Sequence, residues 1–233
     1  MITSSSNERI KAIKKLRDRK YRESSGTYFI EGTRIVYDAI NSHQPIESLI
    51  YSAELCKNQT DKGLIEQAGK SKIELVEVSR DVYQSISQKD GAQGIGAVIR
   101  QNWSDLASIE NGSVWIGLQE IADPGNLGTI MRTADATGVK GIILIDNCTD
   151  PYDPSATRAS MGGIYSLELV RTTTSDLIES LSGQLPIIGT SDAASLDFHA
   201  VEYPQEMLLL MGSERQGLNS ELKHICSHLV SIP

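Results

Sequence analysis

The stretch Pro124-Gly125-Asn126-Leu127-Gly128-Thr129-Ile130-Met131-Arg132-Thr133-Ala134-Asp135-Ala136-Thr137-Gly138 decides how this chain folds. It lies between two apolar runs, residues 114–118 and residues 141–145, which are typical of buried parallel strands. A strand, a glycine-containing turn, a helix and a second strand form a βαβ unit, which places ligands at the turn. The turn has neither the G-x-G-x-x-G of dinucleotide sites nor the Gly-Lys-Ser/Thr of a P-loop. It carries Asn126 and Arg132 instead.

Charge is distributed unevenly along the 233 residues, whose net charge is −8. Residues 1–110 contain 16 Lys+Arg and 15 Asp+Glu, a net charge of +1, whereas residues 111–233 contain 6 and 15, a net charge of −9. Residues 1–23 alone have eight basic and three acidic side chains. A polyanionic partner therefore has to be held mainly by the N-terminal half, or by a few local cations.

The cysteines and the hydropathy restrict the class of protein. Cys56, Cys148 and Cys226 are far apart and form no C-x-x-C pair, so neither a disulfide framework nor a zinc site is indicated. We expect no metal and a cytoplasmic location. No apolar run is long enough to cross a bilayer or to form a signal peptide, so we expect no membrane partner.

The first half alternates strands with helices, which predicts a small α/β sandwich. We expect strands at 28–32, 46–51, 73–78 and 94–99, and helices at 33–41, 62–72 and 81–86. A basic helix is expected at 8–22, either as a solvated surface helix or as one that also contacts phosphates. Residues 104–112 are polar and resemble a linker, so the predicted domains are 1–103 and 113–233.

The second half predicts a parallel sheet with helices between its strands. Further strands are expected at 167–170, 186–190, 207–211 and 229–232, and further helices around 157–163, 175–181 and 219–226.

Two signatures in the second half resemble one family. Asn126-x-Gly128-x-x-x-Arg132-x-Ala134 resembles the first signature of the SpoU (TrmH-like) RNA ribose 2′-O-methyltransferases of the SPOUT class. Gly212-Ser213-Glu214-x-x-Gly217-Leu218 resembles the second, and Arg158-Ala159-Ser160-Met161-Gly162 is similar to the segment between them. In the first half, Glu31-Gly32-x-Arg34 and Gln93-Gly94-Ile95 are similar to an L30e-like substrate-binding domain.

This resemblance implies a fold and an activity. The fold is α/β, with an N-terminal L30e-like sandwich followed by a SPOUT domain that has a parallel sheet and a trefoil knot. The implied reaction transfers a methyl group from S-adenosylmethionine to a ribose 2′-hydroxyl in RNA, in 23S rRNA rather than tRNA, by a homodimer. The alternative is a non-catalytic RNA-binding protein that retains the fold.

The resemblance departs from the family at the last two residues. The third signature, which completes the knot and the donor pocket, should begin at Ile232-Pro233, where the sequence stops. The sequence is then either a fragment of a longer chain, which we favour, or a natural truncation. We expect an incomplete knot and weak donor binding for residues 1–233 alone.

The resemblance also assigns roles to residues. Arg132 is the expected catalytic residue, stabilising the developing alkoxide, because an arginine is a poor base; a buried ion pair with Glu214 is the alternative. Asn126 either caps the helix or contacts the substrate, and Glu214 is expected to hold both. The remaining assignments are Thr190, Gly212 and Ile232 for the donor and Arg34, Arg158 and Ser160 for RNA. His224 and His228 suit a metal only if one helix carries both, and polar residues at a helix end explain them better.

Overall fold

A computed structural model describes residues 1–88, 91–109, 112–181 and 183–232 of the chain. These residues form two compact units. The first unit comprises Met1–Gln101 and Tyr152–Tyr165, and the second comprises Asn102–Pro151 and Ser166–Pro233. This division differs from the predicted domains 1–103 and 113–233, because the segment Tyr152–Tyr165 lies with the N-terminal residues. Within the described residues, no helix is both long and apolar enough to cross a membrane.

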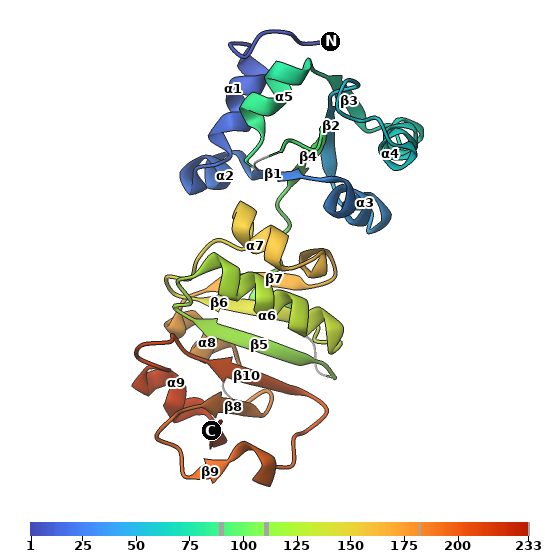
Figure 1. The fold of residues 1–233 in the computed structure, drawn as a ribbon. Coiled ribbons are helices and arrows are strands. Elements are labelled where there is room, and N and C mark those ends of the chain that lie inside the picture. The colour runs from blue at the N-terminus through green and yellow to red at the C-terminus, as the bar shows by residue number, and fades with distance from the viewer. Residues whose placement is uncertain (89–90, 110–111, 182, 233) are drawn as a thin grey trace. The chain divides into compact units, whose positions relative to one another are not determined.

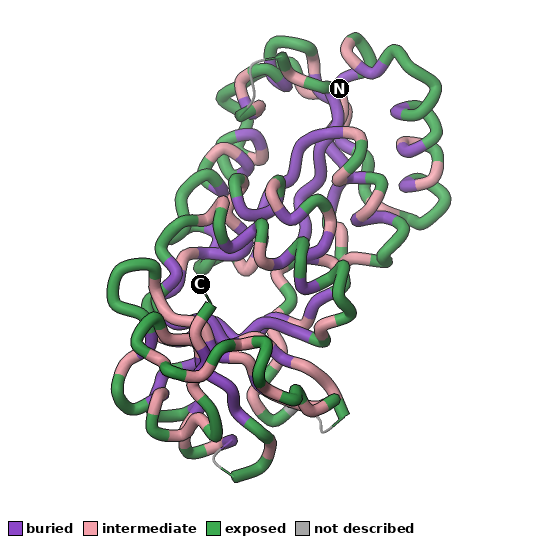
Figure 2. Tube along the Cα trace, turned by 60° about the horizontal axis from the view of Figure 1, so that its bottom comes forward, coloured by how far each residue is buried: buried purple, intermediate pink, exposed green. Residues whose placement is uncertain are grey.

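The first unit is built on a mixed four-stranded sheet, as the alternating pattern predicts. Its strands, in spatial order, are β1 (Thr27–Glu31), β4 (Ile95–Arg100), β2 (Ile46–Tyr51) and β3 (Glu74–Glu77). β4 pairs antiparallel with β1 and with β2, while β2 and β3 are parallel. Every residue of β1 is buried. Buried residues, drawn in purple, gather along the strands in the middle of the chain's two parts (Figure 2).

Helices cover both faces of this sheet (Figure 1). On one face, α1 (Glu8–Lys15) and α5 (Arg80–Ile86) share a core with Phe29, Ile50 and Val98. On the other face lie α3 (Thr33–Asn41) and α4 (Gln59–Lys70). The prediction started α4 at residue 62, but Asn58 caps it by accepting from Asp61 N, so the helix begins three residues earlier.

The segment Tyr152–Tyr165 packs on β1 and α3 of the first unit. It contains α7 (Pro154–Ala159) and a short 3₁₀ helix, η2 (Gly163–Tyr165). The buried ring of Tyr152 lies 4.6 Å from the ring of Tyr28, centroid to centroid. Gln44 Nε2 donates to Tyr165 O at 3.3 Å. This segment connects two strands of the second unit, and buried aromatic packing attaches it to the first unit.

The predicted helix over residues 8–22 is wrong, because the chain breaks it into α1 and α2 (Arg19–Ser25). Asp18 starts α2 by accepting from Lys20 N at 2.9 Å. The guanidinium of Arg22, which is only 2% exposed, donates to the carbonyl oxygens of Leu16 and Arg17 at 2.9 Å each. These carbonyls lie at the end of α1, where helical partners run out, so a buried cation holds the break.

The second unit is built on a parallel seven-stranded sheet, which confirms the predicted fold class. Its strands, in spatial order, are β7 (Glu168–Thr172), β6 (Gly141–Ile145), β5 (Val114–Gln119), β10 (Met207–Met211), β8 (Ile187–Thr190), β11 (His228–Ser231) and β9 (Leu196–Asp197). The two-residue β9 and the 3₁₀ helix η3 (Phe198–Ala200) after it were not predicted, because so short a segment has no periodicity to recognise.

Helices lie on both faces of this sheet, which buries β6 on both sides. α6 (Pro124–Ala136) covers one face, and α8 (Thr174–Leu181) and α9 (Ser220–Ile225) lie on the other (Figure 1). The core beneath α8 and α9 contains Trp115, Ile143, Leu177, Leu208 and Leu222. The linker contributes a 3₁₀ helix, η1 (Leu106–Ser108), and Ser104 N donates to Leu169 O of β7 at 2.8 Å.

Candidate active site

Asp123, and not Asn126, caps the helix that follows the central turn. Its Oδ1 atom accepts from Asn126 N at 2.7 Å, and Pro124 occupies the first helical position, where its missing N–H costs nothing. Asn126 therefore has its side chain available for another role. Its Nδ2 atom donates to Oε1 of Glu214 at 2.9 Å. The two signatures, 88 residues apart, meet through this hydrogen bond.

The second signature forms a tight loop after β10. Gly217 N donates to Ser213 O at 2.9 Å, and Gly217 has a φ of +64°, which favours glycine. A Cβ atom on Gly212 would lie 2.0 Å from the carbonyl carbon of Gly217 and 2.2 Å from Leu218 N. The loop closes on itself at Gly212 so closely that only glycine fits there.

A network of polar side chains holds Asn219, the residue that follows this loop. Gln119, at the end of β5, accepts from Asn219 N at 2.9 Å and donates to Asp146 Oδ2 at 3.0 Å. Asp146 Oδ2 also accepts from Thr174 Oγ1 at 2.6 Å. Burial raises the pKa of Asp146, but the hydrogen bonds from Thr174 and Gln119 outweigh it and hold that pKa below its usual value. These residues were not predicted, because they lie outside both signatures.

The strand order explains where the loops converge. β5, β6 and β7 proceed to one side of the sheet, while β10 and β8 lie on the other side of β5. The order thus reverses between β5 and β10, and ligands bind at such a switch point beyond the carboxyl ends of the strands. Two cavities lie at this edge.

The first cavity has a volume of about 310 Å³ and brings together all three predicted donor residues. Thr190 follows β8, Gly212 follows β10, and Ile232 follows β11. Ile232 is 57% exposed and lines this cavity, so it adds an apolar residue to a largely polar lining. We call it the donor cavity, after the role that the sequence analysis expects for these three residues.

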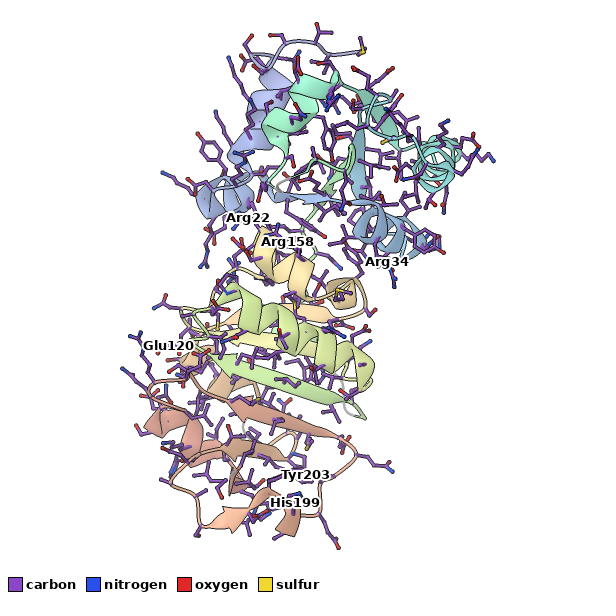
Figure 3. The ribbon with its side chains drawn as sticks, in the orientation of Figure 1. Arg22, Arg34, Glu120, Arg158, His199 and Tyr203 are labelled. Carbon is purple, nitrogen blue, oxygen red and sulfur yellow. The ribbon has the colours of Figure 1, made fainter. Side chains whose placement is uncertain are left out.

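The second cavity, of about 700 Å³, adjoins the first along residues 213–216. It is lined by Glu120, Ala122, Asp123, Asn126, Ser213, Glu214, Arg215 and Gln216. Glu214 lines both cavities, and the hydrogen bond from Asn126 holds the pKa of Glu214 below its usual value. Glu214 is therefore ionised at neutral pH and can only accept hydrogen bonds, which fixes the Asn126 amide with its nitrogen toward Glu214. We call this the acceptor cavity; Glu120 at its wall is labelled in Figure 3.

Arg132 lies apart from both cavities. It is an exposed residue of α6 and is not among the described residues that line either one. Arg132 lies six positions after Asn126, so it is about 9 Å further along the helix and about 120° around it. The alternative of an Arg132–Glu214 ion pair is not found in the described part of the chain, where Glu214 bonds to Asn126 instead.

The predicted RNA contacts lie in the first unit (Figure 3). Arg34 of α3 has a side chain that is 81% exposed and pairs with Asp38 at 3.0 Å. Arg158 of α7 is exposed. Ser160, by contrast, is buried and donates its hydroxyl to Thr157 O at 2.8 Å, which accounts for this serine without a ligand.

The two histidines near the chain's end do not share a helix. His224 lies in α9, whereas His228 begins β11. Across the described residues, no group of three His, Cys, Asp or Glu side chains is placed to hold a metal ion.

Comparisons with known proteins agree on one family. Residues 113–233 match the SpoU rRNA Methylase family, and residues 7–97 match the MRM3-like substrate binding domain. The chain is similar to the AdoMet-bound rRNA methyltransferase of Sinorhizobium meliloti, with 31% identity, a TM-score of 0.89, and coverage of 100% of this chain and 88% of that one.

Two curated relatives are named as 23S rRNA methyltransferases. The 23S rRNA (uridine(2479)-2′-O)-methyltransferase of Streptomyces viridochromogenes is 28% identical over 94% of this chain and 78% of its own length. The 23S rRNA (guanosine(2553)-2′-O)-methyltransferase RlmP of Bacillus subtilis is 25% identical over 95% and 85%. With its two signatures joined between two cavities at the switch point of a parallel sheet, the chain belongs to the SpoU rRNA methylase family.

Proposed function

We propose that this protein transfers a methyl group from S-adenosylmethionine to a ribose 2′-hydroxyl of ribosomal RNA, and of 23S rRNA in particular. The observation that carries the proposal is the Asn126–Glu214 hydrogen bond, which joins the two family signatures at the wall shared by the two cavities. Membership of the SpoU family and similarity to two 23S rRNA methyltransferases support it.

The donor cavity suits the methyl donor. Its volume of about 310 Å³ lies within the usual range of small-molecule sites. Ile232 supplies an apolar surface for an adenine ring, and the glycine at 212 lets the loop close tightly on Gly217, which places the loop's backbone N–H and C=O groups at the cavity. Thr190, Gly212 and Ile232 would hold the donor there. When bound, S-adenosylmethionine supplies an electrophilic methyl group.

The acceptor cavity suits a ribose. Because Glu214 is ionised and takes the Asn126 nitrogen, the Asn126 carbonyl oxygen is left to accept a hydrogen bond from a ribose hydroxyl. A 2′-hydroxyl is a weak acid, so its oxygen must be held in place and its developing charge stabilised while its proton passes to solvent water. The oxygen then takes the methyl group, and S-adenosylhomocysteine leaves. Asn126 and Glu214 hold the oxygen, and a cation is needed to stabilise the charge.

Arg132 supplies that cation in this proposal, and a second copy of the chain brings it to the site. Arg132 is exposed and lies off both cavities of its own chain, so in this scheme it acts at the acceptor cavity of the second copy in a homodimer. The guanidinium stays protonated and acts by electrostatics, stabilising the alkoxide and the neighbouring phosphate.

The first unit holds the RNA in this scheme. It matches a substrate-binding domain and carries the exposed Arg34 and Arg158, which suit phosphate contacts. We leave Ser160 out because its hydroxyl is buried and already bonded. We place the activity in the cytoplasm, where ribosomal RNA and reduced thiols such as Cys56 and Cys148 are both expected.

The test uses the full-length protein, tritiated S-adenosylmethionine, and 23S rRNA, 16S rRNA and bulk tRNA as separate substrates. We expect label in 23S rRNA at a ribose that resists alkaline cleavage on its 3′ side. Arg132→Ala should lower the methylation rate by about 10²-fold or more while donor affinity changes by less than about twofold. Equal losses of rate and donor affinity would count against the catalytic role of Arg132.

A further inference from the structure

A cavity of about 360 Å³ opens in the first unit between α1, α2 and the sheet, and none of its lining residues belongs to either family signature. Its floor contains the buried apolar side chains of Ile13, Leu16 and Val98. Its remaining walls are polar, basic or aromatic, and include Glu8, Arg9, Lys11, Lys15, Tyr21 and Glu47. The charged wall residues are three basic and two acidic, a net charge of +1. An apolar floor beneath walls with this excess of positive charge suits a flat, partly apolar group that belongs to an anion.

Lys15 and Tyr21 form one corner of this cavity, where a cation and an aromatic ring lie side by side. The ammonium nitrogen of Lys15 lies 4.9 Å from the centroid of the Tyr21 ring, a cation–π contact. Tyr21 is 41% exposed, so a large aromatic residue is open to solvent. Within the described residues, Lys15 makes no ion pair, so its charge is not neutralised by a carboxylate.

The other charged groups at the cavity are already paired. Lys11 bonds to Glu8 at 2.7 Å, and Arg9 bonds to Glu74. Glu47 is taken by Arg100 at 2.7 Å. The field at the cavity is thus dominated by Lys15 and by the excess of cations in residues 1–23, eight basic against three acidic.

The break between α1 and α2 creates this corner. In one continuous helix, residues six apart lie about 9 Å along the axis and about 120° around it, so the Lys15 amine and the Tyr21 ring would not meet. The break at residues 16–18 turns α2 back, and the buried Arg22 guanidinium holds it there through the carbonyls of Leu16 and Arg17. The buried Arg22 guanidinium therefore keeps this corner formed.

We propose that this cavity binds an unstacked nucleobase of the RNA substrate, with the base against Tyr21 and the adjoining phosphate near Lys15. Base–aromatic stacking contributes about 1–3 kcal/mol per base in single-strand binding sites. Cations close to the ring attract the phosphodiester and disfavour a basic or apolar peptide. The inference rests on the proposed function, since it assigns part of the RNA to this cavity and extends the substrate contacts beyond Arg34 and Arg158.

The test measures binding of fluorescein-labelled 12-nucleotide oligouridylate and oligoadenylate to the full-length protein by fluorescence anisotropy over a range of salt concentrations. Tyr21→Leu should weaken binding by about 5- to 100-fold, whereas Tyr21→Phe, which keeps the ring, should stay within about twofold of wild type. Lys15→Ala should weaken binding and reduce the slope of log K against log salt by about one. Tyr203→Leu is the matched control, because Tyr203 is also 41% exposed and lies in the second unit.

Three outcomes would overturn the inference. One is oligonucleotide binding by Tyr21→Leu that equals binding by wild type. Another is equal displacement of the probe by polyglutamate from wild type and Tyr21→Leu, which would indicate a general polyanion or acidic-peptide surface. The third is failure of wild type to bind either oligonucleotide. Methylation of 23S rRNA by wild type, measured in parallel, separates these results from failure of the proposed function.

Discussion

Replacing Gly212 by alanine should weaken S-adenosylmethionine binding while leaving the rest of the protein folded. The new Cβ would lie 2.0 Å from the Gly217 carbonyl carbon, 2.2 Å from Leu218 N and 2.3 Å from Gly217 O. Non-bonded carbon atoms settle near 3.5 Å, so the loop must move by roughly 1.2–1.5 Å. All three contacts are backbone atoms, and no side chain can swing away to absorb the clash.

The size of the effect follows from that displacement. Gly212, Gly217 and Glu214 all line the donor cavity, so the shift moves its wall directly. A misplacement of about 1 Å in a binding site costs up to about 10²-fold. We therefore expect donor affinity to fall by about 10- to 100-fold, or about 1.4–2.7 kcal/mol.

The assay is isothermal titration calorimetry of S-adenosylmethionine and S-adenosylhomocysteine with the full-length protein, with circular dichroism and thermal melting as folding checks. Gly63→Ala is the matched control: Gly63 lies in α4, and a Cβ there meets nothing within 4 Å. That variant should bind donor normally and melt at the same or a slightly higher temperature. Donor affinity within twofold of wild type in Gly212→Ala, at an unchanged melting temperature, would refute this account of the loop.

Three further predictions concern single groups. Asn126→Asp should lower the methylation rate by at least about tenfold, because two carboxylates then face each other. Adding Glu214→Gln should recover part of the lost rate by restoring one hydrogen bond. A double variant as slow as Asn126→Asp would contradict the view that this pair positions the substrate. The pKa of Asp146 is lowered, so its hydrogen bonds with Thr174 stabilise the fold above the usual aspartate pKa of about 4 and are lost as pH falls further. In urea unfolding, Asp146→Asn should lower the free energy of unfolding by about 1–3 kcal/mol at pH 7, and it should make that free energy fall less steeply with decreasing pH in the acid range. An equally steep fall in wild type and variant would contradict this. Burial raises the pKa of the Cys226 thiol to about 11, so little reactive thiolate is present at pH 8. Iodoacetamide at that pH should therefore label Cys226 about 10²-fold more slowly in the native protein than in denaturant, as measured by mass spectrometry. Equal labelling rates would contradict the burial of this thiol.

Strong periodicity made much of the fold predictable. The apolar runs at 114–118, 141–145 and 207–211 are observed as β5, β6 and β10, because buried parallel strands need an unbroken apolar sequence. The helix at Thr33–Asn41 was predicted with its observed bounds for a similar reason, since its apolar residues recur on one face. Local preference and tertiary packing agree in these elements.

Prediction failed where the burial of a side chain overrides local preference. Residues 8–22 have helical spacing throughout, but the guanidinium of Arg22 turns inward to the carbonyls of Leu16 and Arg17, and the helix breaks. A basic side chain in a basic stretch carries no signal that it is buried. The same holds for α7, whose attachment depends on the packing of Tyr152 on Tyr28, 124 positions earlier in the chain.

By itself, the sequence determined the fold class, the two signatures and the identity of Asn126, Glu214, Thr190, Gly212 and Ile232 as site residues to be tested. Only the tertiary structure decided how they relate. It places the last three around one cavity, joins Asn126 to Glu214 and leaves Arg132 off both cavities of its own chain. The physical reason is the sheet order: β10 inserts between β5 and β8, so loops distant in sequence meet at one edge, and strand order is set by long-range packing that no local pattern encodes.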